Sequence, residues 1–308
     1  MFDLQGHRGA RGLWPENTLA GFAAAIELGV CAVELDCGVT RDGVVVVSHD
    51  PELNPDCTRD ARGQFLAAAG PPIFALTYAQ LQSYDVGRLR PGGAYAARFP
   101  QQRPVDGERI PRLADVLTLI RARGRGRVRV ALEIKTFPQQ PDLTLAPEPF
   151  AQLVQTDVQR TGTAGLVEIL AFDWRVLSAA QRLMPQVPTV ALTEEQPGED
   201  TVRVGSRPAS PWLGGLDPVR FDGSVTRLVK ATGACAWGPD YLDLDAQRVE
   251  QAHALNLRVV PWTVNEPADM ERLLAFNVDG MITDRPDVLR ALLEERGRPV
   301  PPRPPEPS

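Results

Sequence analysis

Two histidines and two carboxylates lie close together near the start of the sequence. His7 and His49 stand on either side of an apolar run, residues 32–39, that carries Glu34 and Asp36. Histidine transfers protons near neutral pH. Because Glu34 and Asp36 are two residues apart, an extended strand would point both to one face, where they repel unless a cation lies between them. These are the parts of a site that cleaves phosphodiesters.

A hairpin is expected to return His49 toward the acidic strand. Asp42 and Gly43 form a turn signal between two β-branched runs. Pairing about this turn predicts that Glu34 and His49 are neighbours across the hairpin. A slip of one residue would turn every side chain to the opposite face.

A later β-branched run ends with Glu133 and Lys135, which an extended strand places on one face. In α/β barrels the C-terminal ends of the strands form the catalytic face. Glu34, Asp36 and Glu133 together would supply three hard oxygen ligands, which suit Mg²⁺ or Ca²⁺ better than Zn²⁺. Arg8 and Lys135 offer positive charge for a phosphate.

Strand-like and helix-like segments alternate along the chain, which predicts a one-domain (β/α)8 TIM barrel. An open doubly wound sheet is the competing architecture, but no GxGxxG motif follows a strand and opens a helix. Residues 234–237 are a candidate for an additional strand. The expected strands are 2–6, 32–39, 44–48, 128–134, 167–171, 188–192, 258–263 and 278–283. The expected helices are 18–28 with an Asn17 cap, 113–122, 150–161, 174–184, 245–255 and 267–276.

Three stretches do not fit this alternation. Residues 51–111 are too long for a plain connection, and they predict an inserted subdomain or lid after the third strand. Residues 193–222 predict a smaller excursion on a barrel loop. The tail 296–308 holds six prolines and is expected to be extended or disordered. We therefore expect one barrel domain over residues 1–295.

The composition is that of an ordinary globular protein. The chain has 308 residues, of which 43% are hydrophobic and 23% charged, near the upper end of single-domain length. A formal net charge of −6 gives no reason to expect nucleic acid or an acidic membrane surface as a partner. No run approaches the roughly 18 apolar residues of a membrane span, so no stable membrane insertion is expected.

The cysteines bear on the cellular compartment. The four cysteines form no CxxC pair or regular framework, which favours buried, reduced thiols. No export-signal pattern opens the sequence. We therefore expect a cytoplasmic location, although a trimmed periplasmic or secreted form would carry the same residues. Nothing in the sequence marks the oligomeric state.

Seven short motifs, taken in order, resemble the glycerophosphodiester phosphodiesterase family. The match runs from residue 7 to about residue 284, and the ordered set is far more specific than any one motif. The resemblance implies a TIM barrel with the segment after His49 as the family's insertion, a divalent metal, and hydrolysis of glycerophosphodiesters such as glycerophosphocholine or glycerophosphoethanolamine to sn-glycerol 3-phosphate and an alcohol. The motifs are His7-Arg8-Gly9, Pro15-Glu16-Asn17-Thr18, Glu34-Leu35-Asp36, Thr40-Arg41-Asp42-Gly43, His49-Asp50, Glu133-Ile134-Lys135 and Trp262-Thr263-Val264-Asn265.

The same resemblance implies a role for each candidate site residue. Two histidines form an acid/base pair, three carboxylates hold one Mg²⁺ or Ca²⁺, two cations bind phosphate, and a tryptophan forms an apolar wall against the glycerol. In that order, these residues are His7 and His49; Glu34, Asp36 and Glu133; Arg8 and Lys135; and Trp262. The nucleophile, either water or the glycerol 2-hydroxyl, stays open, as does the order in which the histidines act.

Each candidate also has a structural explanation when it is taken alone. A lone tryptophan such as Trp262 is more often core packing, and Glu133 with Lys135 would be an exposed ion pair of little consequence. Two other functions stay open. One is a non-catalytic glycerophosphodiester-binding protein. The other is a lysophospholipase D-type enzyme at a membrane, for which residues 73–76 are the only apolar candidate rim.

Overall fold

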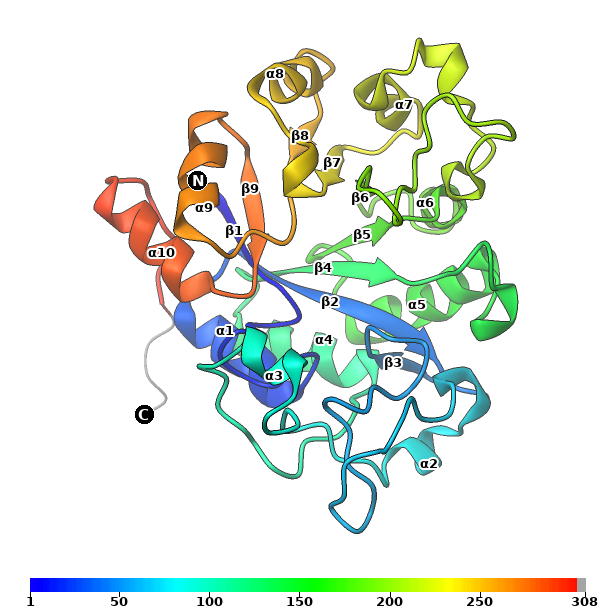
Figure 1. Ribbon diagram of the computed structural model, residues 1–308, viewed down its shortest axis with the longest axis vertical. Helices are drawn as coiled ribbons and strands as arrows, with labels where there is room; N and C mark the ends of the chain where they lie inside the picture. The colour runs from blue at the N-terminus through cyan, green and yellow to red at the C-terminus, as the bar shows by residue number, and fades with distance from the viewer. Residues whose placement is uncertain (304–308) are drawn as a thin grey trace.

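The computed structural model describes residues 1–303 and shows a nearly closed barrel of parallel strands surrounded by helices (Figure 1). Around the barrel the strands follow the order β8-β7-β6-β5-β4-β2-β1-β9. The predicted (β/α)8 barrel is confirmed. Its strands are β1 (Asp3–Gly6), β2 (Ala32–Val39), β4 (Arg129–Ile134), β5 (Val167–Ala171), β6 (Thr189–Thr193), β7 (Ala236–Pro239), β8 (Arg258–Val259) and β9 (Gly280–Thr283).

Helices follow these strands and cover the outside of the barrel. They are α1 (Leu19–Leu28), α4 (Leu113–Arg123), α5 (Pro147–Thr161), α6 (Trp174–Leu183), α7 (Val225–Ala231), α8 (Ala246–Ala254), α9 (Pro267–Ala275) and α10 (Pro286–Glu295). The predicted cap of the first helix is wrong, because the Thr18 hydroxyl accepts the hydrogen bond from the Gly21 N–H. Asn17 instead donates its amide to Asp36 Oδ2 at 3.0 Å.

The strand predicted at 44–48 is not a barrel strand. It forms β3 (Val45–Val47), which pairs antiparallel with β2 and lies off the path of the barrel. The barrel strand that takes its place is β7, which overlaps the candidate segment 234–237 at residues 236–237 and extends to Pro239. The predicted number of eight barrel strands is therefore correct, but one of the predicted strands, 44–48, lies outside the barrel.

The predicted register of the hairpin between β2 and β3 is wrong by one residue. Cys37 pairs with Val47, and the Ser48 N–H bonds to the Asp36 carbonyl oxygen, so Glu34 is not opposite His49. The loop has three residues, 41–43, because Gly43 adopts a left-handed φ of +78° and adds one position to the turn.

β8 and β9 do not pair as regular strands, but a few backbone hydrogen bonds join the segments that contain them and bridge the remaining gap in the barrel. The predicted strand 258–263 is regular only at its first two residues, since Pro261 has no N–H to offer to a ladder. Its carbonyl still accepts from the Ile282 N–H at 2.9 Å. The Asp279 N–H likewise bonds to the Val259 carbonyl at 2.9 Å.

Both faces of the barrel strands are buried, which explains their continuous apolar sequences. In β2, Val33, Leu35 and Cys37 pack in the large core between strands and helices. Side chains alternate along a strand, so Glu34 and Asp36 point into the barrel. Strand periodicity thus places the carboxylates among the residues that fill the barrel.

Residues 48–112 form a long excursion between β3 and α4, with the short helices α2 (Tyr78–Leu81) and α3 (Ala94–Arg98) (Figure 1). A small apolar cluster packs it against the hairpin, and Ile73 is buried there. The segment 73–76 therefore takes part in packing, with Ile73 turned inward. That residues 51–111 form a subdomain of their own stays a prediction.

The C-terminal segment is described as far as Arg303. Residues 298–303 hold no helix or strand, and half-buried Val300 packs against the large core. The prediction for the remainder of the tail, 304–308, lies outside the described residues. Within residues 1–303, no helix combines the length and apolarity that crossing a membrane requires.

A polar network of buried acids and half-buried arginines lies at the N-terminal end of the barrel. Asp3 in β1 accepts from Arg129 in β4 and from Arg258 in β8, each at 2.5 Å. Arg129 also reaches Glu168 in β5 at 3.0 Å, and Gln5 donates to Asp3 at 3.0 Å. The network joins four strands at the end of the barrel opposite the C-terminal strand ends.

Asp3→Ala should lower the free energy of unfolding by about 2–3 kcal/mol, because it removes the buried carboxylate that accepts hydrogen bonds from two arginines and Gln5. Catalytic turnover should be unchanged, since this end of the barrel serves stability. Urea denaturation and an activity assay measure the two effects. As a control, Glu27→Ala breaks only the exposed ion pair with Arg123 and should cost about 0.5 kcal/mol or less. Equal losses in both variants would contradict the assignment.

Candidate active site

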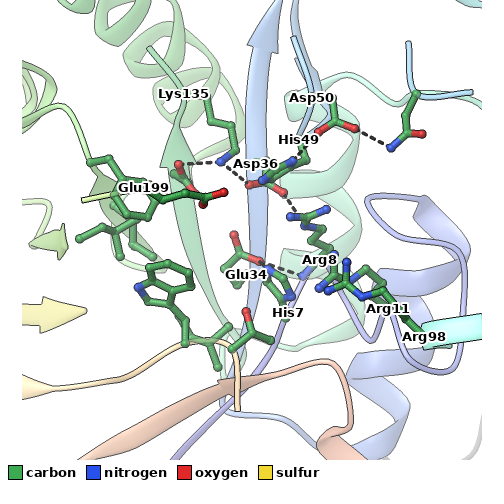
Figure 2. Close-up of a pocket in the computed structure, with 18 of the residues that line it drawn as sticks. His7, Arg8, Arg11, Glu34, Asp36, His49, Asp50, Arg98, Lys135 and Glu199 are labelled. Carbon is green, nitrogen blue, oxygen red and sulfur yellow. Dashed lines mark hydrogen bonds and ion pairs between the residues drawn. The ribbon is translucent and has the colours of Figure 1, made fainter. Parts of the chain in front are cut away.

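All eight predicted site residues line one cavity of about 350 Å³ at the C-terminal ends of the strands (Figure 2). Arg8, Arg11 and Arg98 enter the cavity from one side, and Lys135 and Glu199 from the other. Glu199 belongs to the excursion 193–222, which holds two short 3-10 helices and no strand after β6 ends. The predicted residues in the cavity are His7, Arg8, Glu34, Asp36, His49, Glu133, Lys135 and Trp262.

Three buried carboxylates form the centre of the site. β2 and β4 are neighbours in the barrel with Asp36 beside Glu133, so oxygen atoms of Glu34, Asp36 and Glu133 lie within 4.8 Å of one another. Burial and repulsion from Asp36 raise the pKa of Glu34 well above its usual value. The cluster therefore offers three hard oxygen donors that repel one another, and this donor set fits a divalent cation such as Mg²⁺ or Ca²⁺.

Two cations already lie against these carboxylates. Lys135 Nζ is 2.8 Å from Glu133 Oε1 and 3.3 Å from Asp36 Oδ1, and Arg8 Nε is 3.2 Å from Asp36 Oδ2. Burial opposes charge on Lys135, but Glu133 and Asp36 together raise its pKa above the usual value. Burial likewise opposes charge on Asp36, yet Lys135 and Arg8 hold its pKa well below the usual range. Both cations therefore remain charged inside the site.

His7 is held by a carboxylate, Asp284, that directly follows the last barrel strand. Its Nδ1 lies 2.6 Å from Asp284 Oδ1, and its Nε2 lies 3.8 Å from Glu34 Oε2. Burial lowers the pKa of His7 to about 4, although Asp284 acts in the opposite direction. Arg11 donates two hydrogen bonds to Asp284, at 2.9 and 3.0 Å, and fixes that carboxylate in turn.

His49 has the same arrangement on the other side of the cavity. Its Nδ1 lies 2.7 Å from Asp50 Oδ1, and the Asn54 amide donates to Asp50 Oδ2 at 2.7 Å. Burial lowers the pKa of His49, and the positive charges of Lys135 and Arg8 lower it further. Because Nδ1 of each ring faces a carboxylate, Nε2 is the nitrogen left for chemistry in the cavity.

The backbone around His7 is shaped to deliver these contacts. Arg8 has a left-handed φ of +49°, and its N–H donates to Glu34 Oε2 at 2.8 Å. Gly9 follows with a φ of +91°, where a Cβ atom would lie 3.0 Å from the Gly21 carbonyl carbon. The sequence His7-Arg8-Gly9 therefore forms a tight turn at the end of β1 that no bulkier residue at position 9 would allow.

The opposite wall of the cavity is apolar. The Trp262 indole donates to the Gly238 carbonyl at 2.9 Å, which fixes the plane of the ring. Its edge meets the ring of Phe172 with centroids 5.3 Å apart. Leu170 and Leu192, from the interior of the barrel, complete this side. The cavity thus offers a charged half and an apolar half.

Sequence reasoning missed the residues that hold the candidates in place. Asp284 directly follows β9, and an acidic residue at the C-terminal end of a strand, the same signal that points to Glu133, could have found it. Asp50 and Glu16 belong to two of the seven motifs, but the sequence assigns no role to either residue. Arg11 carried no signal, because its partner Asp284 lies 273 residues away in the sequence.

Comparison with known proteins places the chain in a family. Residues 7–288 match the glycerophosphoryl diester phosphodiesterase family. The chain belongs to this family. The resemblance inferred from the seven motifs is therefore confirmed, and with it the prediction that the protein is an enzyme of this family.

Several relatives match over nearly their whole length. A glycerophosphodiester phosphodiesterase of Caldanaerobacter subterraneus is 27% identical over 291 residues, which cover 94% of this chain and 97% of the relative. A Silicibacter pomeroyi structure described as a glycerophosphoryl diester phosphodiesterase superposes with a TM-score of 0.85 at 35% identity, covering 96% and 93% of the two chains. An Oleispira antarctica phosphodiesterase, solved with its product sn-glycerol-3-phosphate, shares the fold with a TM-score of 0.69 at 20% identity, over 94% and 96%.

The metal-free protein should lose stability as the pH falls from 6.5 to about 4. In this window His7 takes up a proton in the unfolded chain but stays neutral when buried, so acid favours unfolding. The loss attributable to His7 should approach roughly 3 kcal/mol at the lower end. Urea denaturation over this pH range measures it. His7→Asn should flatten the dependence, and an equal slope in both proteins would contradict the burial of a neutral imidazole.

Proposed function

We propose that the protein hydrolyses glycerophosphodiesters, such as glycerophosphocholine or glycerophosphoethanolamine, to sn-glycerol 3-phosphate and an alcohol. In this proposal two histidines transfer protons beside one divalent cation. The observation that carries it is that His7 and His49, each oriented by its own carboxylate, share a cavity with three clustered carboxylates. The sn-glycerol-3-phosphate bound as product by the Oleispira antarctica relative supports the choice of substrate.

The proposed phosphate ligands are Arg8 and Lys135. Arg8 is buried and the Lys135 side chain is only 12% exposed, and at this edge of the carboxylate cluster low polarity strengthens their attraction for an anion. Charge-assisted hydrogen bonds from a guanidinium and an ammonium would hold the equatorial phosphate oxygens. They would also stabilise the charge that grows on these oxygens as the bond breaks.

His7 and His49 are the proposed acid/base pair. Asp284 and Asp50 would hold Nδ1 of each ring, keep Nε2 directed at the substrate, and stabilise the imidazolium formed in turn. One histidine removes a proton from the nucleophile while the other protonates the leaving alkoxide. With water as nucleophile the products form in one step, whereas attack by the glycerol 2-hydroxyl passes through a cyclic phosphate. Trapping that cyclic species in a single turnover decides between the two routes.

The proposed metal ligands are Glu34, Asp36 and Glu133. Mg²⁺ or Ca²⁺ bound there would neutralise phosphate charge and act as a Lewis acid. Glu34 is further fixed by the backbone N–H of Arg8, so its position depends on the turn after β1. Trp262, braced by Phe172, would cover the apolar face of the glycerol.

Replacing either histidine by asparagine should reduce kcat by about 10²-fold or more, because each variant lacks one proton-transfer group. A coupled dehydrogenase assay for released glycerol 3-phosphate measures turnover, and thermal unfolding checks that the fold is retained. His253→Asn is the matched control, since His253 is half-exposed, pairs with Asp279 at 2.9 Å, and does not line the cavity. Near-normal turnover in both His7→Asn and His49→Asn would exclude the proposed pair.

Dialysis against EDTA should abolish turnover, and added Mg²⁺ or Ca²⁺ should restore it. Glu34→Gln removes one negative ligand and should weaken metal binding at least about tenfold in calorimetry. Undiminished turnover after exhaustive removal of divalent cations would contradict a metal-dependent reaction. The same assay separates the alternatives, since a pure binding protein would bind glycerophosphocholine without turnover, and a lysophospholipase D would prefer lysophosphatidylcholine.

A further inference from the structure

The long excursion between β3 and α4 returns to the cavity at the short helix α3, which contributes Tyr95. We propose that Tyr95 is a positioning residue, which fixes Arg8 through Glu16 and so sets the affinity of the site for the phosphate of the substrate. This inference rests on the proposed role of Arg8 as a phosphate ligand. It gives the excursion a function in binding, in addition to its own packing.

One carboxylate joins the tyrosine to the arginine. The Tyr95 hydroxyl donates to Glu16 Oε2 at 2.5 Å, and Glu16 Oε1 accepts from Arg8 Nη1 at 2.7 Å. The hydroxyl also accepts a hydrogen bond from Arg11 Nη1 at 3.2 Å. The hydroxyl therefore donates a hydrogen bond to Glu16 and accepts one from Arg11, which fixes the direction of its O–H bond.

The anchored guanidinium is not fully hydrogen-bonded. Arg8 Nη1 donates to Glu16, whereas Nε is buried and lies 3.2 Å from Asp36 Oδ2 as an ion pair without a hydrogen bond. Within residues 1–303, Nη2 also has no hydrogen-bond partner, and unlike Nε it is not among the fully buried atoms, so it is the nitrogen available for a phosphate oxygen. The side chains of Arg8 and Glu16 are only 8% and 12% exposed, so water competes little with these bonds. If Glu16 turned, Arg8 would lose the contact that directs Nη2.

Glu16 is ionised and is oriented by hydrogen bonds from Tyr95 and Arg8. Burial opposes its charge, but Arg8 and Arg11 hold its pKa below the usual value, so it accepts from both Tyr95 and Arg8. The excursion therefore supplies the only hydroxyl that orients this carboxylate among the residues the structure describes.

Helix α3 is docked by contacts that do not involve the hydroxyl. The Tyr95 ring meets Phe99 edge to face with centroids 5.3 Å apart, and the Arg11 guanidinium lies 4.7 Å over the Phe99 ring. Beyond the helix, Gln102 donates to the Arg11 carbonyl at 2.8 Å and the Arg103 N–H to the Leu13 carbonyl at 2.8 Å. Removing only the hydroxyl should leave this docking in place.

Tyr95→Phe should raise KM about tenfold and lower kcat less than about threefold, because most of the attraction between Arg8 and the phosphate is already present in the bound substrate and only a small part is added as charge grows in the transition state. The dissociation constant of sn-glycerol 3-phosphate, measured by calorimetry, should rise by a similar factor. A merely structural role would instead lower the active fraction, and with it kcat, at unchanged KM. Tyr78→Phe is the matched control, since Tyr78 lies in the same excursion and its hydroxyl has no hydrogen-bond partner among residues 1–303; its KM should stay normal.

A double-mutant cycle with Glu16→Ala tests the route through Glu16. If Tyr95 acts through that carboxylate, the double variant should lose no more kcat/KM than Glu16→Ala alone. Losses that add, or an unchanged KM and product affinity in Tyr95→Phe, would overturn the inference. If Glu16→Ala does not fold, the calorimetry of Tyr95→Phe still decides. Failure of the proposed function is distinguishable, because the wild-type protein would then release no glycerol 3-phosphate.

Discussion

The repulsion among Glu34, Asp36 and Glu133 is the constraint on which the rest of the site depends. Neighbouring parallel strands β2 and β4 place the three carboxylates inside the barrel, where they are almost fully buried and water screens their charges only weakly. Burying negative charges is costly unless positive charge or hydrogen bonds compensate. Lys135, Arg8 and the Arg8 N–H supply part of that compensation. A divalent cation, in the proposed function, supplies the remainder.

The supporting residues follow from the same requirement for fixed charge. Arg8 contacts Asp36 and is itself held by Glu16, and His7 is held by Asp284, which Arg11 grips with two hydrogen bonds. Each of these charged groups therefore contacts an opposite charge or a hydrogen-bonding partner. Such layers of support keep side chains in one orientation, which a site that stabilises developing charge requires.

The two ends of the barrel carry different charged groups: those at one end contribute to stability, and those at the other form the candidate active site. At the N-terminal end, Asp3 and Glu168 are paired with Arg129 and Arg258, and the network carries no histidine and lies outside the cavity. At the C-terminal end the three clustered carboxylates outnumber the two cations against them, and burial together with repulsion from Asp36 raises the pKa of Glu34. An imbalance of charge is unfavourable for folding, and it is what gives this end its capacity to bind a cation.

The sequence by itself determined the barrel, the residue types of the site and most of their strands, because these follow from local periodicity and from ordered short motifs. Only the tertiary structure decided the partners. Asp284 meets His7 across 277 residues, and no pattern within a segment encodes that contact. The hairpin register depended on one left-handed glycine, Gly43, whose extra loop position moved His49 away from Glu34. Tyr95 reaches Glu16 only because an irregular excursion packs back onto the barrel, and irregular chains lack the periodicity that makes strands and helices predictable.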